Sequence, residues 1–221
     1  MRELPSIAVL GGSGAQGRGL AQRFVRAGRR VIVGSRDPQR ARAAVAGWAD
    51  AGRAVDVATN ADAVSQSRVV VVAVPFSTVA ALLEDVQSHL AAGSLVVDVT
   101  VPVAFSGGTM SMIDVPEGSA AEHVRARLPP SVRVAGTFKT VPAQLVGDVE
   151  RPLDCDEFVC GDSDSARSET AALVRLLPGL RAVDVGPLSR ARSVEHLTAL
   201  AISINRRHHI HDARFRVVGL P

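Results

Sequence analysis

The sequence SIAVLGGSGAQG, residues 6–17, joins a short apolar run to a glycine-rich turn. Gly12, Gly14 and Gly17 fit the pattern GxGxxG, and helical spacing of apolar residues follows over residues 16–27. A glycine turn between an apolar strand and a helix suits a dinucleotide, because N–H groups at the helix start can meet the pyrophosphate. An ordinary strand-to-helix turn is the alternative, and the flanking strand and helix favour dinucleotide binding.

Each glycine of the turn has its own expected role. Gly12 permits the tight turn, Gly14 lets the backbone approach the pyrophosphate, and Gly17 lets the helix pack close to the strand. The predicted phosphate site consists of Gly12, Ser13, Gly14, Ala15, Gln16 and Gly17.

The end of the second predicted strand indicates which dinucleotide is bound. NAD-binding chains place an acidic residue there, about 20 residues past the glycines, to bind the ribose 2′-hydroxyl. This chain has Ser35 and Arg36 instead, followed by Arg40 one helical turn later. A hydroxyl and two guanidinium groups suit a 2′-phosphate, and Asp37 is expected to cap the helix that begins at Pro38. The sequence therefore predicts NADP(H), with a solvated strand end in an arginine-rich chain as the alternative.

Apolar runs and helical patterns alternate along the chain. Further strands are expected at residues 31–34, 69–74, 95–99, 132–138, 158–160 and 182–185. Helices are expected at residues 38–51, 78–90, 119–128, 165–177 and 193–204, the third with a capping box formed by Ser119 and Glu122. Residues 107–118 are interpreted as a loop because they contain three glycines and a proline.

Continuous apolar strands indicate a sheet that is covered on both faces. The predicted fold class is α/β, a Rossmann-type doubly wound and mainly parallel sheet with a small C-terminal α+β domain. Residues 1–140 would form the dinucleotide-binding domain and residues 141–221 the small domain.

Composition excludes several other classes. Hydrophobic residues make up 47% of the chain and charged residues 21%, so a sizeable core is expected. A net charge of +3 does not support binding to nucleic acid. No apolar run is long enough to span a bilayer and no signal peptide is visible, which predicts a soluble cytoplasmic protein. Cys155 and Cys160 fit neither a disulfide framework nor a zinc site, and are expected as buried thiols.

The remaining titratable residues have ordinary interpretations. His208, His209 and His211 are too close in sequence to surround one ion, so no metal site is expected. His196 is expected in the core or at an interface. A solvated acidic loop is expected to contain Asp154, Asp156, Glu157, Asp162 and Asp164.

Short motifs continue in order to the C-terminus. They are Val-Pro-Phe at 74–76, Val-Pro-Val at 101–103, Thr-Val-Pro-Ala at 140–143, Val-Cys-Gly-Asp at 159–162, Asp-Val-Gly-Pro-Leu at 184–188 and Glu-His-Leu-Thr at 195–198. Together with the glycine turn and residues 33–36, they resemble the NADP-dependent reductases of coenzyme F420, an 8-hydroxy-5-deazaflavin, nearly end to end.

The resemblance implies that NADP(H) lies across the glycine turn, with F420 against the nicotinamide in a cleft completed by residues 141–221. It implies hydride transfer between the nicotinamide C4 and the deazaflavin C5, and a homodimer with residues 141–221 at its interface. The cofactor-binding residues implied after later strands are Val74, Pro75, Val101, Pro102, Val103, Lys139, Thr140, Val141 and Pro142. Ligands of open α/β sheets bind at the carboxyl ends of the strands, so the predicted strands agree with this placement.

One position departs from the family. Relatives commonly have His or Asn before Thr140, where this chain has Lys139, its only lysine. As a catalytic candidate, Lys139 would stabilise negative charge on the reduced deazaflavin, with a surface lysine as the alternative. No obligate acid or base is expected, because hydride chemistry belongs to the two cofactors. A different acceptor (an imine, a flavin or a metal chelate) and a non-catalytic NADPH sensor are the alternative functions.

Overall fold

The computed structural model describes residues 6–48 and 55–220. Its main sheet consists of β1 (Ile7–Leu10), β2 (Val31–Ser35), β3 (Val55–Thr59), β4 (Val69–Val72), β5 (Leu95–Asp98), β8 (Arg133–Gly136), β9 (Cys155–Gly161) and β10 (Leu180–Pro187). The strand order is β10-β9-β8-β5-β4-β1-β2-β3. From β3 to β8 all neighbours are parallel, in the order typical of a Rossmann fold. The predicted fold class is therefore confirmed.

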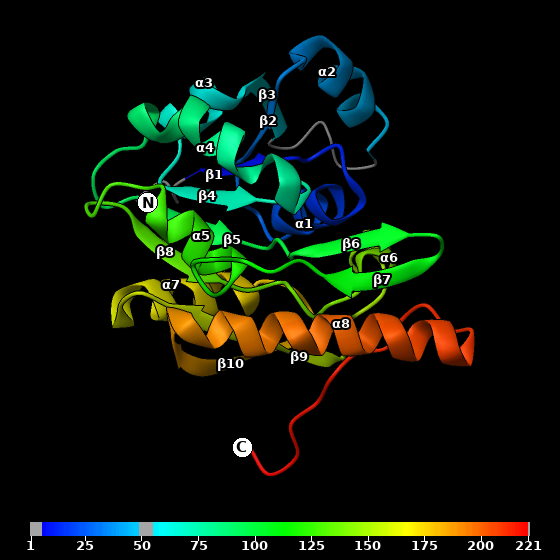
Figure 1. Ribbon diagram of the computed structural model, residues 1–221. Coiled ribbons are helices and arrows are strands. Elements are labelled where there is room, and N and C mark those ends of the chain that lie inside the picture. The colour runs from blue at the N-terminus through cyan, green and yellow to red at the C-terminus, as the bar shows by residue number, and fades with distance from the viewer. Residues whose placement is uncertain (1–5, 49–54, 221) are drawn as a thin grey trace.

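Helices cover both faces of this sheet (Figure 1). They are α1 (Ala15–Arg26), α2 (Pro38–Ala46), α3 (Asn60–Ser65), α4 (Val79–Val86), α5 (Ala120–Ala126), α6 (Ala143–Gly147), α7 (Asp164–Val174) and α8 (Ala191–His208). Three 3₁₀ turns are η1 (Phe76–Thr78), η2 (Gln87–His89) and η3 (Leu188–Arg190). Alternate strand residues point to opposite faces. Ile7 and Val9 therefore belong to one core cluster, together with residues of α1, α6 and α7, and Ala8 and Leu10 belong to a second, together with residues of α3, α4 and α5.

The sequence predicts a loop at residues 107–118, and this prediction is wrong for the first half of that range. β6 (Val103–Ser106) and β7 (Thr109–Met112) form an antiparallel hairpin, which lies beside α8 (Figure 1). Gly107 and Gly108 form its turn with φ angles of 54° and 76°. Two positive φ angles are what a tight hairpin turn requires, so the glycines connect two strands here.

Other boundaries also differ from the prediction. β3 and α3 were not predicted, and α2 ends at Ala46, before Gly47. The part of the helix expected at residues 49–51 lies outside the described residues. The predicted cap of α5 is confirmed, since Glu122 N donates to Ser119 Oγ at 3.1 Å.

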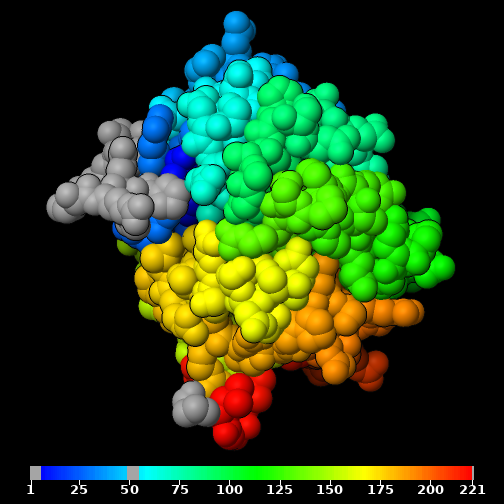
Figure 2. Space-filling view, turned by 90° about the vertical axis from the view of Figure 1, so that its left-hand side faces the viewer, coloured from blue at the N-terminus to red at the C-terminus, as the bar shows by residue number. Residues whose placement is uncertain are grey.

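The C-terminal residues extend the same sheet. β9 is antiparallel to β8, and β10 is parallel to β9. Because β8 and β9 run in opposite directions, the amino end of β9 lies at the edge where β8 ends. Figure 2 shows residues from the two halves joined in one body, with the C-terminal segment at its lower end. The division at residue 140 stays a prediction. Within the described residues, no helix is long and apolar enough to cross a membrane.

Candidate functional site

The glycine turn joins β1 to α1 with very little space around two of its residues. Gly11 has a φ of 90°, and a Cβ placed on it would lie 2.5 Å from the carbonyl oxygen of Ala73, just after β4. A Cβ on Gly17 would lie 2.4 Å from the carbonyl oxygen of Gly11. Gly17 therefore lets α1 pack against the turn, as predicted, whereas the left-handed conformation of the turn belongs to Gly11.

Gly14 is different because its surroundings are open. The nearest atom to a Cβ placed there is the Gly11 carbonyl oxygen, at 3.4 Å. Gly14 is exposed and is the N-cap of α1, whose first turn contains no acidic side chain. The first N–H groups of a helix lack partners within the helix and carry partial positive charge. This turn can therefore accept an anionic group close to the backbone.

Two arginines lie free at the end of β2. Arg36 and Arg40 are exposed, and neither guanidinium group has a hydrogen bond or ion pair with another described residue. The Ser35 hydroxyl already bonds to the backbone of Asp37, donating to its oxygen at 3.0 Å. The Asp37 carboxylate accepts from Arg40 N at 3.0 Å, which confirms the predicted cap of α2. The charge available to a ligand here is thus positive.

The loops after β1, β4, β5 and β8 meet at one edge of the sheet. Gln16 Nε2 donates to the carbonyl oxygen of Phe138 at 2.9 Å, which links the start of α1 to the segment after β8. Ala73 N donates to Leu10 O at 2.8 Å, which links the ends of β4 and β1. The strand order reverses between β1 and β4, the place where open α/β sheets bind ligands. Pro102, Thr140 and Val141 are buried at this edge, while Val74, Pro75, Val101, Val103 and Pro142 are partly or fully exposed.

Lys139 is buried, so the alternative of a surface lysine is wrong. Its ammonium lies 2.6 Å from Asp98 Oδ2, 2.6 Å from the carbonyl oxygen of Thr100 and 3.1 Å from Glu195 Oε1. The contact with Glu195 is an ion pair without hydrogen-bond geometry. Burial alone would lower the pKa of Lys139, but the charges of Asp98 and Glu195 outweigh it, and the net effect raises this pKa. Direct contact between this ammonium and a ligand would require one of the three oxygens to give way.

Glu157 belongs to this edge, although the sequence predicts it in a solvated loop. Its Oε1 accepts from Lys139 N at 2.9 Å, and its Oε2 accepts from the Thr140 hydroxyl at 2.9 Å and from Val141 N at 3.1 Å. Burial raises its pKa to about 7, although these hydrogen bonds act in the opposite direction. Through these hydrogen bonds, the Glu157 carboxylate fixes the backbone at the start of the Thr-Val-Pro motif.

The solvated loop expected at residues 154–164 is therefore wrong for two residues. Asp156 and Glu157 are buried in β9, and Asp156 forms paired hydrogen bonds of 2.8 Å with Arg181. This pairing was not predictable because Arg181 lies on the neighbouring strand, 25 residues away in the sequence. His196 is exposed on α8, with Nδ1 2.7 Å from Arg192 O, so it is not a core histidine.

Both cysteines are free and buried, as predicted. Burial raises the pKa of Cys155 to about 12 and that of Cys160 to about 11, so neither is a thiolate near neutral pH. Across residues 6–48 and 55–220, no three His, Cys, Asp or Glu residues are grouped to hold a metal ion.

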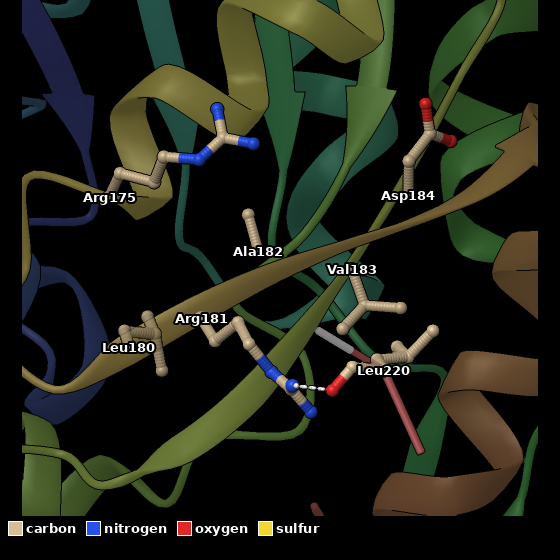
Figure 3. A pocket seen from close by; sticks show the side chains of 7 residues that line it. All are labelled: Arg175, Leu180, Arg181, Ala182, Val183, Asp184 and Leu220. Carbon is tan, nitrogen blue, oxygen red and sulfur yellow. Dashed lines mark hydrogen bonds between the residues drawn. The ribbon is translucent and has the colours of Figure 1, made fainter. Parts of the chain in front are cut away.

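Two surface cavities formed by described residues can be compared with this edge. The larger of the two, about 590 Å³, runs along β10 and is lined in part by Leu220, whose carbonyl accepts from Arg181 (Figure 3). β10 is the outermost strand of the sheet, five positions from β1. The smaller cavity, about 180 Å³, includes Pro102, Met112, Arg192 and Glu195 among its lining residues. Only the smaller one adjoins the loop after β5.

Comparison with known proteins agrees with this geometry. A family model described as NADP oxidoreductase coenzyme F420-dependent matches residues 6–102. The chain is 38% identical to the F420-dependent NADP reductase of Methanothermobacter thermautotrophicus, over 97% of this chain and 95% of that protein. It is 36% identical to the protein of the same name from Methanothermobacter marburgensis, over 97% and 99%. A crystal structure of a candidate F420-dependent NADP reductase from Arthrobacter sp. FB24 superimposes with a TM-score of 0.85 and 28% identity, covering 97% of this chain and all of that one.

The strand order and the open glycine turn define the class, a Rossmann-type NADP oxidoreductase. Within that class, the match of 36–38% identity over nearly the full length of both chains decides the assignment. The chain belongs to the family of F420-dependent NADP reductases.

Proposed function

We propose that this protein transfers a hydride between NADP(H) and coenzyme F420. The observation that carries the proposal is the match along 97% of the chain to reductases named for these two substrates. A match confined to the dinucleotide half would support NADP(H) alone. Here it extends through β9, β10 and α8, which a protein that only senses NADPH would not need.

NADP(H) would lie across the glycine turn, with its pyrophosphate at the start of α1. The open space at Gly14 allows an anion to approach the backbone there. Arg36 and Arg40 would bind the 2′-phosphate, because both are exposed and no described carboxylate neutralises them. Ser35 could join them by exchanging its bond to Asp37 for one to the phosphate.

The nicotinamide and the deazaflavin would meet over the loops after β4, β5 and β8. The proposed lining residues are Val74, Pro75, Val101, Pro102, Val103, Thr140, Val141 and Pro142. The ring systems themselves exchange the hydride, and the chain binds them in register and excludes water. The hydrogen bond between Gln16 and the Phe138 carbonyl supports this arrangement, since it fixes the glycine turn relative to the β8 loop.

An absorbance assay with the full-length protein tests the proposal. Oxidised F420 should be bleached when NADPH is added, whereas free flavin, a cyclic imine and a ferric chelate should not be reduced. Arg36→Ala should slow the reaction at low NADPH concentration and leave the rate at saturating NADPH nearly unchanged, as expected for loss of ground-state binding. A protein that binds NADPH tightly but never reduces F420 would contradict the assignment, and the other acceptors identify which alternative is correct.

A homodimer and a cytoplasmic location belong to the same proposal. Phe105 on β6 is 66% exposed and Leu200 on α8 is 50% exposed. The two elements are neighbours, because β7 contacts both β6 and α8. Large apolar side chains exposed on neighbouring elements are typical of a contact surface. Sedimentation of the wild type and of Leu200→Glu tests the dimer, since a monomeric wild type would contradict it.

A further inference from the structure

The Lys139 ammonium joins the segment after β8 to two other parts of the chain, the end of β5 and α8. Asp98 ends β5 and Thr100 begins the loop toward Pro102, while Glu195 comes from α8. The backbone of Lys139 is also held by α8, because the Thr198 hydroxyl donates to Lys139 O at 2.8 Å. Glu195 and Thr198 are three residues apart on one face of the helix, so α8 contacts Lys139 through both its side chain and its carbonyl.

The segment around Lys139 has a conformation that needs support. Phe138 has a φ of 54°, a left-handed conformation that is unfavourable for a side chain of this size. The Phe138 ring packs edge-on against Phe24, with ring centres 6.0 Å apart. Glu157 accepts hydrogen bonds from the next three residues on the other side. The loop therefore follows a single path only while these contacts persist.

The same cluster borders the smaller cavity. Glu195 lines it together with Pro102, Met112 and Arg192, next to the β6–β7 hairpin. Ala120 N donates to Glu195 Oε2 at 3.1 Å, so this carboxylate is fixed from α5 as well. Movement of Lys139 would release one wall of the cavity and the loop that carries Pro102.

We propose that Lys139 is a positioning residue, which holds the loops after β5 and β8 against α8 and thereby shapes the side of the crevice that receives the hydride acceptor. This inference rests on the proposed function for the identity of the acceptor. The Lys139 ammonium acts through Thr100, Asp98 and Glu195, and it does not touch the acceptor.

The dinucleotide side should depend much less on Lys139. Its phosphate-binding groups are the glycine turn and the β2 arginines, none of which contacts the ammonium. The hydrogen bond that links the turn to this segment, from Gln16, goes to the carbonyl of Phe138 and does not involve the ammonium. Loss of the ammonium should therefore change acceptor binding and transfer more than NADPH affinity.

Two variants and one control test the proposal. Lys139→Met removes the ammonium, and Lys139→Met/Asp98→Asn also neutralises the carboxylate 2.6 Å away, which would otherwise be buried without its partner. Arg125→Met is the matched control: Arg125 donates to the carbonyls of Leu128, Pro129 and Val132 before β8, away from the crevice. For each protein, NADPH dissociation constant, acceptor KM, kcat, thermal stability and amide hydrogen exchange are measured.

Lys139→Met should raise the KM for F420 or lower kcat by about 10-fold to 100-fold, the range expected when positioning is lost. The NADPH dissociation constant should change less than threefold. The double variant should regain thermal stability without regaining the acceptor parameters. Arg125→Met should lose stability with acceptor parameters near wild type.

Two results would overturn the proposal. One is a double variant that recovers both stability and acceptor parameters, because an unpaired buried charge would then explain the defect. The other is an equal loss of NADPH affinity in Lys139→Met. Hydrogen exchange keeps this test separate from the proposed function: faster exchange at residues 99–103 and 139–142 is expected in Lys139→Met even if F420 is not the acceptor, and unchanged exchange there would also overturn the proposal.

Discussion

The proposed crevice has two walls, one at the end of β2 and the other at the loops after β5 and β8. Positive side chains are exposed on the first wall and buried in the second. Beside β2, Arg36 and Arg40 are exposed, and their guanidinium groups have no partner among the residues described. Beside β5 and β8, Lys139 is buried and its ammonium contacts three oxygen atoms of the protein. An exposed guanidinium is available to a ligand and costs the fold little, whereas a buried ammonium is committed to the fold.

This difference predicts two kinds of mutational response. Changes on the β2 wall should alter ligand binding while the fold persists. Changes around Lys139 and Glu157 should alter stability and its dependence on pH. The glycine turn contains both kinds of position within four residues, since Gly14 faces open space and Gly17 faces backbone.

The largest contrast is expected between Gly17→Val and Gly14→Val. A Cβ on Gly17 would lie 2.4 Å from a backbone oxygen, so Gly17→Val should cost about 3 kcal/mol or more of folding stability. Gly14→Val has room for its Cβ and should fold, but its side chain would occupy the space needed by the pyrophosphate. Thermal unfolding and NADPH titration measure the two effects. A folded Gly14→Val protein with normal NADPH affinity would remove the turn from the binding site.

The pH dependence of stability should identify the buried carboxyl on the other wall. Burial raises the pKa of Glu157 from 4.5 to about 7, so the folded state holds this proton more tightly than the unfolded chain does. The resulting stabilisation is complete below about pH 4.5 and is lost as the pH rises through about 7, amounting to something on the order of 3 kcal/mol.

Glu157→Gln should flatten this dependence when the free energy of unfolding is measured from pH 5 to pH 8. Over that range Lys139 stays charged and Cys155, with a pKa raised to about 12, stays neutral. Glu195 also has a pKa raised by burial, so Glu195→Gln is the matched control. An unchanged slope in Glu157→Gln with a flat Glu195→Gln would assign the proton to Glu195 instead.

The β2 wall should respond in binding alone. Arg36→Ala should weaken NADPH by about tenfold to a hundredfold, roughly 1.5–3 kcal/mol for a charge-assisted hydrogen bond. NADH, which lacks the 2′-phosphate, should bind nearly as before, and the melting temperature should not move. Titration with both dinucleotides checks the expectation, and equal losses for the two would show that Arg36 does not contact the 2′-phosphate.

The same contrast explains what the sequence could predict. The glycine turn, the Asp37 cap and the Ser119 cap depend on residues within a few positions of one another, so local pattern is sufficient. The Lys139 cluster joins residues 41 and 56 positions apart, and Glu157 contacts residues 16 to 18 positions away. Asp98 meets Lys139 because β5 and β8 are parallel neighbours, Glu195 meets it from α8, and Glu157 meets residues 139–141 because β9 runs antiparallel to β8. No local pattern specifies these pairings. The β6–β7 hairpin was missed for the opposite reason: its two glycines were interpreted as loop residues, although they form the turn of a hairpin.

The smallest effect is expected at Asp37, an acidic residue on the β2 wall. Asp37 is the one carboxylate close to Arg36 in sequence, and an acid at the end of β2 would favour NAD(H) if it faced the ribose. Instead it accepts a hydrogen bond from Arg40 N at 3.0 Å as the cap of α2. Asp37→Ala should therefore cost about 1 kcal/mol of stability, the usual value of an N-cap. NADPH affinity should be retained or slightly increased, because a negative charge near the 2′-phosphate has gone.

Asp37→Asn can still cap the helix and should keep most of the stability, so chemical denaturation of the two variants separates the effect of the cap from the effect of the charge. A loss of NADH binding in Asp37→Asn, with stability intact, would instead place this carboxylate at the ribose and would weaken the case for NADP(H) preference on this wall.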